Sequence, residues 1–224
     1  MPPISDNLSL LKTQIETAAK KADRRPQEIS LLAVTKNVEV TQIIEAIEAG
    51  ITDIGESYVQ EASSKIPIIK SKFPNVRFHL IGHLQTNKVK TALELFDVIQ
   101  SVDSYHLAEE ISKRAVRPAE IFIEVNTSGE ESKFGVAPEK ALELIGQITG
   151  LPNLRISGLM TIGKYTDDEK EIRQCFKKLK ELRDKAGIPG LKLSMGMSHD
   201  YTLAIEEGSD IIRVGEGIFG PRRK

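Results

Sequence analysis

The stretch ISLLAVTKNVEVTQIIEAIEAGITDIG, residues 29–55, decides the fold of this chain. It begins with an apolar run, Ile29–Thr35, which is typical of a buried β-strand. An amphipathic segment, Thr41–Ala49, has apolar residues at helical spacing, and Gly50 suits the position just past the end of a helix. A second strand-like run follows at Asp53–Gly55. Because two strands that flank one helix pair in parallel, the stretch predicts one β/α unit of a parallel sheet.

The same alternation continues to the end of the chain and gives eight strand-like runs. Eight β/α units predict a single domain over residues 1–224, a (β/α)8 TIM barrel, with an extra helix at Asn7–Ala22 before the first strand. An open, doubly wound sheet also fits this count. The other strand-like runs are Arg77–Ile81, Asp97–Val102, Glu120–Val125, Ile156–Ile162, Lys192–Met195 and Asp210–Val214, and the other helical segments are Tyr58–Ile69, Tyr105–Ala115, Pro138–Ile148, Asp167–Lys185 and Tyr201–Glu206.

The bulk composition excludes several classes of protein. The formal net charge is −1, so no global positive charge favours binding to nucleic acid. A membrane span needs about 18 uninterrupted apolar residues, and the sequence contains no such run. The N-terminus has no basic-then-apolar signal segment, so a cytoplasmic protein is expected. The only cysteine, Cys175, cannot form an internal disulfide and fits a reducing compartment.

In a barrel of this type the functional residues lie where strands end and βα loops begin. The first strand is followed directly by Lys36. A lysine that closes an apolar strand either extends to the rim or is held there as an amine for chemistry. Partial burial lowers the pKa of a lysine and makes the neutral, nucleophilic amine available. The position alone leaves both interpretations open.

Two further strand-end residues have an ordinary interpretation beside a functional one. His79, near the end of the third strand, is more often a hydrogen-bonded residue of the barrel interior than a ligand-binding one. The four histidines of the chain do not have the spacing of metal ligands, so no metal site is expected. Met160, near the end of the sixth strand, either lines a flat ligand or fills the core.

The last two strands lead into Ser194–Asp200 and Arg213–Gly220, which are rich in small and hydroxylated residues. Barrel enzymes often bind phosphate at the loops after strands seven and eight. The Ser198 hydroxyl can donate to a phosphate oxygen. Gly215 allows close approach of the backbone, and the N–H groups of Glu216 and its successor can point at oxygen. The alternative is that the glycines serve only tight turns.

An amine and a phosphate site in one small barrel fit two kinds of chemistry. One is a Schiff base with pyridoxal 5′-phosphate (PLP), a phosphorylated aldehyde cofactor. The other is a Schiff base with a sugar phosphate, as in an aldolase. In a closed barrel the first strand, which carries Lys36, neighbours the eighth, which carries Gly215. The amine and the phosphate site are therefore expected to be close together.

Seven motifs, taken in order, resemble the YggS/PROSC family, the pyridoxal phosphate homeostasis proteins. The resemblance covers nearly the whole chain. It implies a fold-type III PLP barrel like the N-terminal domain of alanine racemase, without the second domain. The motifs are AVTK (33–36), GESYVQE (55–61), HLIGHLQTNK (79–88), GEESK (129–133), GLM (158–160), SMGMSHD (194–200) and RVGEGIFG (213–220).

The resemblance also implies a cofactor site. Lys36 would carry PLP as an aldimine, and Arg213 would face the pyridine nitrogen. At position 57 the family usually has asparagine, whereas this chain has Ser57, which keeps a hydroxyl but loses the amide donor. No residue is assigned a catalytic role. The cofactor-binding residues implied are Lys36, Ser57, His79, Met160, Ser198, Arg213, Gly215 and Glu216.

Arg213 bears on what the cofactor could do. A guanidinium is only a donor and stays charged, so it satisfies an unprotonated ring nitrogen without favouring its protonation. PLP would then be a weak electron sink. The resulting hypothesis is a monomeric PLP carrier in vitamin B6 and amino-acid homeostasis, without substantial catalysis, that has PLP-dependent enzymes as transient recipients.

Three other functions remain open from the sequence, one of them the sugar-phosphate aldolase named above. A PLP-dependent amino-acid racemase needs bases on both faces of the cofactor, and Lys36 supplies one, while Tyr58, Tyr165 and Tyr201 lie near strand ends. A regulatory protein with PLP as its signal would need a partner surface, for which the loop Gly129–Lys133 and the basic tail at residues 221–224 are available.

Overall fold

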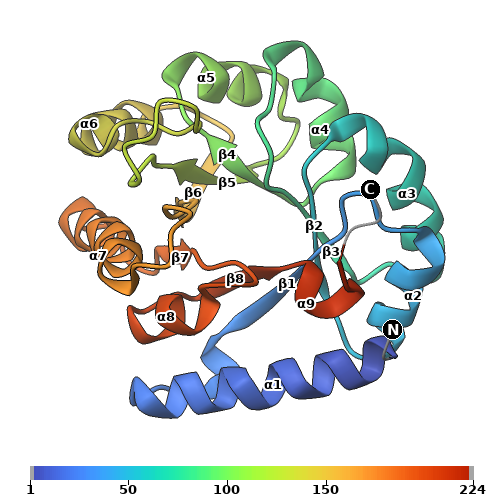
Figure 1. The fold of residues 1–224 in the computed structure, drawn as a ribbon. Helices are drawn as coiled ribbons and strands as arrows, with labels where there is room; N and C mark the ends of the chain where they lie inside the picture. Colours follow the sequence, from blue (N-terminus) through green and yellow to red (C-terminus); the bar gives the residue numbers. More distant parts are fainter. Residues whose placement is uncertain (1–2, 222–224) are drawn as a thin grey trace.

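The computed structural model describes residues 3–221, so residues 222–224 of the basic tail lie outside the described part. Eight parallel strands close into a barrel in chain order, and β8 (Ile211–Val214) pairs with β1 (Ser30–Val34) (Figure 1). The TIM barrel is confirmed, and the open doubly wound sheet is excluded. The strands between them are β2 (Asp53–Glu56), β3 (Arg77–Leu80), β4 (Val98–Val102), β5 (Ala119–Glu124), β6 (Leu154–Met160) and β7 (Lys192–Ser194).

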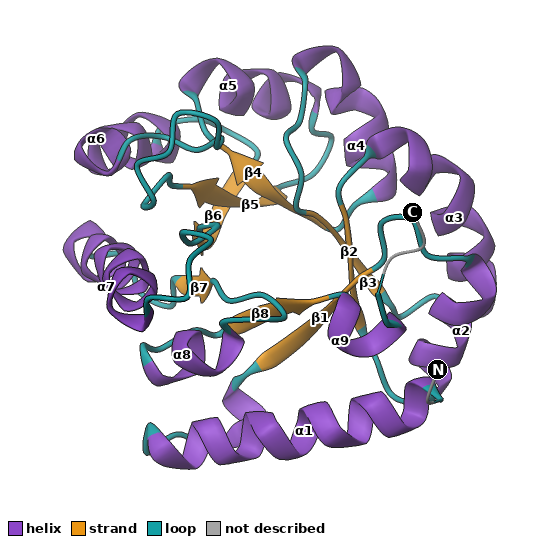
Figure 2. Ribbon diagram, viewed as in Figure 1, coloured by secondary structure: helices purple, strands orange, loops and turns teal. Residues whose placement is uncertain are grey.

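Helices surround the barrel on its outer side (Figure 2). The sequence prediction gave no bounds for two of them, α4 and α9, which have seven and four residues. None of the described helices is long and apolar enough to cross a membrane. The helices are α1 (Ile4–Lys21), α2 (Val40–Glu48), α3 (Val59–Lys72), α4 (Val89–Leu95), α5 (Tyr105–Arg114), α6 (Pro138–Thr149), α7 (Glu169–Ala186), α8 (Tyr201–Glu206) and α9 (Glu216–Phe219), and short 3-10 turns lie at Pro26–Glu28 and Thr86–Lys88.

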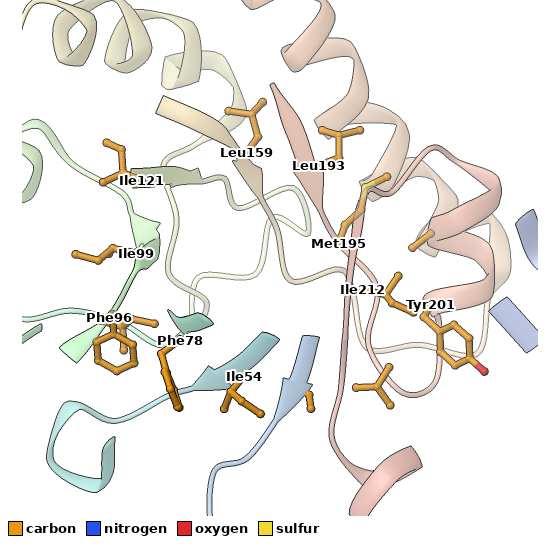
Figure 3. Packing of buried hydrophobic residues seen from close by; sticks show 14 of the residues in the cluster. Ile54, Phe78, Phe96, Ile99, Ile121, Leu159, Leu193, Met195, Tyr201 and Ile212 are labelled. Atoms are coloured by element: carbon orange, nitrogen blue, oxygen red, sulfur yellow. The ribbon is translucent and has the colours of Figure 1, made fainter. Parts of the chain in front are cut away.

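The main hydrophobic core lies between the barrel and the helices. Successive side chains of a strand point to opposite faces, so every second residue points outward. Figure 3 shows several of these outward residues, among them Ile54, Phe78 and Ile212. All three are almost completely buried. This layer therefore holds the helices against the sheet.

The barrel interior contains a smaller apolar cluster with polar side chains beside it. Leu32, Phe122 and Met160 belong to the interior cluster. Further inward-pointing positions carry Gln100 and Arg213, which are also buried. Because a buried polar group is costly unless it is hydrogen-bonded, these positions demand partners inside the barrel.

The predicted N-terminal helix is present as α1, which packs beside α8 and α9 (Figure 1). Its buried face includes Leu8 and Leu11. Two hydrogen bonds reinforce this packing. The Asn7 amide donates to the Ile218 carbonyl at 2.9 Å, and the Tyr201 hydroxyl donates to the Gln14 side chain at 2.6 Å. The first helix is thus attached to the last part of the chain.

Candidate PLP site

A cavity of about 410 Å³ lies between the turn after β1 and helix α9. Its lining includes Lys36, Gly215 and Glu216. The cause is barrel closure, because Ala33 on β1 is in register with Val214 on β8. The amine and the glycine turn, which are far apart in the sequence, therefore share one cavity, as the sequence predicts.

Lys36 is half-buried and lies in a turn whose two flanking residues are fixed. On one side, the buried Thr35 hydroxyl donates to Glu56 Oε1 at 2.6 Å, and the Thr35 carbonyl accepts from Lys65 Nζ at 2.8 Å. On the other side, Asn37 has a φ of 59° and its N–H donates to Glu61 Oε1 at 2.6 Å. The backbone on both sides of Lys36 is held by α3 and the end of β2.

The charged side chains behind this turn form a cluster of their own. Lys65 Nζ lies 2.5 Å from Glu61 Oε1 and 3.2 Å from Glu56 Oε1. Burial raises the pKa of the Glu56 carboxyl, although Thr35 and Lys65 oppose this rise. None of these three residues has a role predicted from the sequence. Glu56 and Glu61 lie in the GESYVQE motif beside Ser57, which was the signal that could have identified them.

The turn after β7 requires a glycine at position 196. Gly196 has a φ of 95°, and a Cβ there would lie 2.6 Å from the Ala204 Cβ and 2.9 Å from the Tyr201 Cα. The Met197 N–H then donates to the buried Asp200 carboxylate at 2.5 Å. Ser198 lies in this turn, half-buried, and no described residue is hydrogen-bonded to its hydroxyl.

The turn after β8 brings the backbone close to β1. Gly215 precedes α9, and a Cβ there would lie 3.2 Å from the Val34 carbonyl oxygen. The Gly215 carbonyl accepts from the N–H groups of Ile218 and Phe219 at 2.9 and 3.0 Å. The side chain of Glu216 is exposed, which keeps its carboxylate out of the packed core. The N–H groups in the first turn of any helix have no acceptors within that helix, so α9 begins with a surface suited to an anion.

Arg213 lies inside the barrel and is only 4% exposed. Its NH1 donates to the Ser194 hydroxyl at 2.8 Å, and its NH2 donates to the Thr161 carbonyl at 2.7 Å. Burial lowers the pKa of Arg213 to about 10, opposed by the charges of Asp200 and Glu124. The guanidinium is therefore charged at neutral pH, and these two bonds leave other N–H groups for a ligand.

Five of the predicted residues, Arg213 inside the barrel among them, do not line the cavity of Lys36. The ring of His79 is buried between Asp53 and Gln100, and Met160 is in the interior apolar cluster. Ser57 follows β2 and packs its backbone against Gly82, while Ser198 lies in the turn after β7. The structure thus places Lys36, Gly215 and Glu216 together and distributes the other predicted residues through the interior and the neighbouring strand ends.

Glu124 is a buried carboxyl with no role predicted from the sequence. It ends β5, is 3% exposed, and its Oε2 has no hydrogen-bond partner within the described residues. Burial and the charge of Asp103 raise the pKa of Glu124 to about 7, and the charge of Arg213 opposes that rise. The sequence signal that could have identified Glu124 is a charged residue near the end of an otherwise apolar strand, IFIEV at residues 121–125.

The three tyrosines considered for a racemase differ in position. Tyr201 is buried in α8, and its hydroxyl donates to Gln14 on α1, on the outer side of the barrel. Tyr58 and Tyr165 are exposed, and Tyr165 packs edge-on against His199 with ring centres 5.1 Å apart. Tyr201 is thereby removed from the candidates for a base opposite Lys36. Within residues 3–221, no group of three or more His, Cys, Asp or Glu side chains is arranged to hold a metal ion.

Comparison with known proteins places these features in a family. Residues 7–223 match the family model of the alanine racemase N-terminal domain. The chain is 39% identical to the pyridoxal phosphate homeostasis protein of Haemophilus influenzae, over 98% of this chain and 96% of that protein. It is 40% identical to the protein of the same name from Aquifex aeolicus, over 97% and 98% of the two chains.

Solved structures show the same architecture. PipY from Synechococcus elongatus, in a structure with PLP bound, is 34% identical, with a TM-score of 0.82 over 97% of this chain and all of that one. The alanine racemase of Clostridium difficile is only 12% identical, with a TM-score of 0.75, and 58% of its chain is covered. That likeness supports the fold alone.

Proposed function

The chain belongs to the pyridoxal phosphate homeostasis proteins, and on that premise we propose that it holds PLP as a Schiff base on Lys36 and serves vitamin B6 and amino-acid homeostasis. The observation that carries the proposal is the shared cavity of Lys36 and Gly215. Its lysine is suited to an aldehyde, and its glycine turn is suited to a phosphate. PLP presents both groups in one molecule.

We propose one holder for each part of PLP. The backbone at Gly215 and Glu216, with the Ser198 hydroxyl, would bind the phosphate. Arg213 would face the pyridine nitrogen, held by its bonds to Ser194 and Thr161. PLP supplies a reactive aldehyde and an electron-withdrawing ring, and the charged arginine does not protonate that ring. This pairing supports a carrier without substantial catalysis.

Lys36→Ala is the direct test of the lysine. The purified wild-type protein, incubated with PLP, is expected to show a visible absorption band, and borohydride reduction should leave a pyridoxyl group on the peptide that contains Lys36. Lys140→Ala, in the exposed part of α6, is the matched control and should behave as wild type. A band of undiminished strength in Lys36→Ala would show that Lys36 does not carry the cofactor.

The proposed absence of substantial catalysis has its own measurement. The PLP-loaded protein is incubated with L-alanine and other L-amino acids, and the products are separated by chirality. We expect no turnover at ordinary enzyme rates, about 1 s⁻¹ or more. Turnover at such rates would instead support the racemase.

We also propose that bound PLP passes to PLP-dependent enzymes. The half-buried position of Lys36 beside an open cavity supports exchange, because the linkage is accessible to a competing amine. The test mixes the PLP-loaded protein with the cofactor-free form of a PLP-dependent enzyme and follows its recovery of activity. Recovery faster than release of PLP into buffer is expected for direct transfer, and recovery at the release rate contradicts it.

A further inference from the structure

A chain of hydrogen bonds crosses the barrel interior from Arg213 to Asp53. It passes through Ser194, Gln100 and His79 and uses strands β8, β7, β4, β3 and β2. The middle of the chain is dry, because Ser194 and Gln100 are 0% exposed and His79 is 3% exposed. The distances are Arg213 NH1 to Ser194 Oγ 2.8 Å, Ser194 Oγ to Gln100 Oε1 2.6 Å, Gln100 Nε2 to His79 Nδ1 2.9 Å, and His79 Nε2 to Asp53 Oδ1 3.0 Å.

The position of every proton in this chain follows from Arg213. A guanidinium only donates, so the Ser194 oxygen accepts from it and the Ser194 hydroxyl proton must point to Gln100. The Gln100 oxygen therefore faces Ser194, and its amide nitrogen donates to His79. The unprotonated nitrogen of His79 is then Nδ1, and its proton is on Nε2, directed at the Asp53 carboxylate.

This order requires a neutral His79. A cationic imidazole has a proton on each ring nitrogen, and the one on Nδ1 would meet the amide protons of Gln100. Breaking one link would leave a buried donor or acceptor without a partner. The five hydrogen-bonded side chains are consequently fixed as a unit, and none of them can rotate alone.

Asp53 is the last residue in this series of hydrogen bonds, and solvent reaches its side chain. Its side chain is 21% exposed, and it lines a cavity of about 430 Å³ at the opposite end of the barrel from Lys36. Burial favours its neutral form, but hydrogen bonds from His79 and Thr52 outweigh this and lower the pKa of the carboxyl. Asp53 therefore remains a hydrogen-bond acceptor at neutral pH and holds the proton of His79 on Nε2.

From this arrangement we infer that Gln100, His79 and Asp53 are positioning residues for Arg213. They act through Ser194, and they fix the direction in which the guanidinium presents its remaining N–H groups toward the pyridine ring. The inference rests on the proposed PLP site. It gives His79 a role different from the direct contact with PLP that the family resemblance implies, since both ring nitrogens are already engaged.

The proton order can be tested without PLP. In nitrogen NMR of the histidine rings at pH 7, His79 is expected as a neutral ring protonated at Nε2. Gln100→Glu replaces the donor that faces Nδ1 by an acceptor, so Nδ1 of His79 should also carry a proton in this variant. Two results would overturn the proton order. One is a neutral wild-type His79 with its proton on Nδ1, and the other is a Gln100→Glu variant in which His79 keeps the wild-type protonation state.

The positioning role is tested with Gln100→Leu, which removes both side-chain bonds of position 100 but keeps an apolar side chain of similar length. It is expected to weaken PLP binding about tenfold and to shift the absorption maximum of bound PLP. Gln147→Leu, on the exposed face of α6, is the matched control. Wild-type affinity together with a wild-type spectrum in Gln100→Leu would contradict the role.

A second variant and the PLP-free NMR measurement distinguish a folding failure, a failure of the PLP site and a failure of the hydrogen-bond series. If Gln100→Leu does not fold, Ser194→Ala removes a single hydroxyl and is measured in the same way, with the same two outcomes. Failure of the wild type to bind PLP would refute the proposed function, whereas the NMR result in the PLP-free protein judges the hydrogen-bond chain independently.

Discussion

At the scale of single residues, three charged side chains that have no proposed contact with the cofactor lie inside the barrel or behind the turn of Lys36. Lys65 ties together two carboxylates and the backbone before Lys36. Glu124 ends β5 as a buried carboxyl with an unsatisfied oxygen. Asp53 keeps His79 in one proton arrangement. Because buried charges and unpaired polar atoms are costly, each is a sensitive point in the structure.

Glu124 should make stability depend on pH. Its pKa is raised from 4.5 to about 7 in the folded protein, so it binds a proton more tightly when folded than when unfolded. Its contribution to stability is fully present below about pH 4.5 and is lost as pH rises through 7, a difference of about 3 kcal/mol. Glu124→Gln removes this loss and should be more stable than wild type at pH 8.

The measurement is urea unfolding of wild type and Glu124→Gln between pH 5 and 8.5. The difference between the two free energies of unfolding should grow with pH and level off above pH 8. Glu139→Gln, on the exposed first turn of α6, is the control and should show no such trend. A constant difference across the range would mean that Glu124 titrates normally.

Lys65→Met should destabilise the protein, because it leaves Glu56 and Glu61 without their cation. Removal of one partner from a buried ion pair costs about 3 kcal/mol or more, measured here by urea unfolding. The double variant Lys65→Met with Glu56→Gln should recover part of that loss, since one orphaned charge is gone. Lys72→Met, exposed on the same helix, is the control. Equal stability of Lys65→Met and wild type would show that the cluster does not hold the turn.

At the scale of elements, the strand pattern was readable because alternation and apolar runs extend over several residues. All eight strands and the long helices were predictable in this way. The beginning of α7 was placed too early. The helix begins at Glu169 because the Asp168 carboxylate accepts the Lys170 N–H at 2.8 Å. Among the short helices, α8 was predicted, whereas α4 and α9 were given no bounds.

The site was only partly predictable for a related reason. Lys36 and Gly215 could be paired because closure of a barrel places the first strand beside the eighth. Gln100 and Ser194 could not be paired, because their contact depends on which face each strand turns inward and on its depth in the barrel. Strand β4 also shifts register between Ile99 and Val102, which sequence alternation does not reveal.

The turn after β7 provides a test at this scale. Gly196→Ala introduces a Cβ within 3 Å of two atoms of α8 at a positive φ. We expect a loss of about 3 kcal/mol in the free energy of unfolding and weaker PLP binding, because the turn that carries Ser198 must move. Gly146→Ala, in α6 with open space around its Cβ, is the control and should stabilise by up to about 1 kcal/mol. Similar effects from both substitutions would contradict a special role for Gly196.

At the scale of the whole molecule, the exposed large aliphatic side chains of the described residues lie on or beside four different helices. Leu10 is on α1, Ile68 on α3, Val116 follows α5, and Leu142 is on α6. Stable homodimer interfaces bury a continuous, largely apolar area of about 800 Å² per partner. We therefore predict a monomer. Size-exclusion chromatography with light scattering should give the mass of one chain at micromolar concentration, and a mass of two chains would refute the prediction.

The attachment of α1 to α8 and α9 sets an order of events during synthesis. The strand that closes the barrel, β8, is synthesised after the other seven strands, and β1 is synthesised before the others. Until β8 arrives, β1 has a free edge and the apolar face of α1 has no complete surface to cover. The first elements therefore stay incompletely covered until β8 and α9 have been made. The proposed PLP cavity, formed at the β1–β8 seam, comes into existence only in that last step.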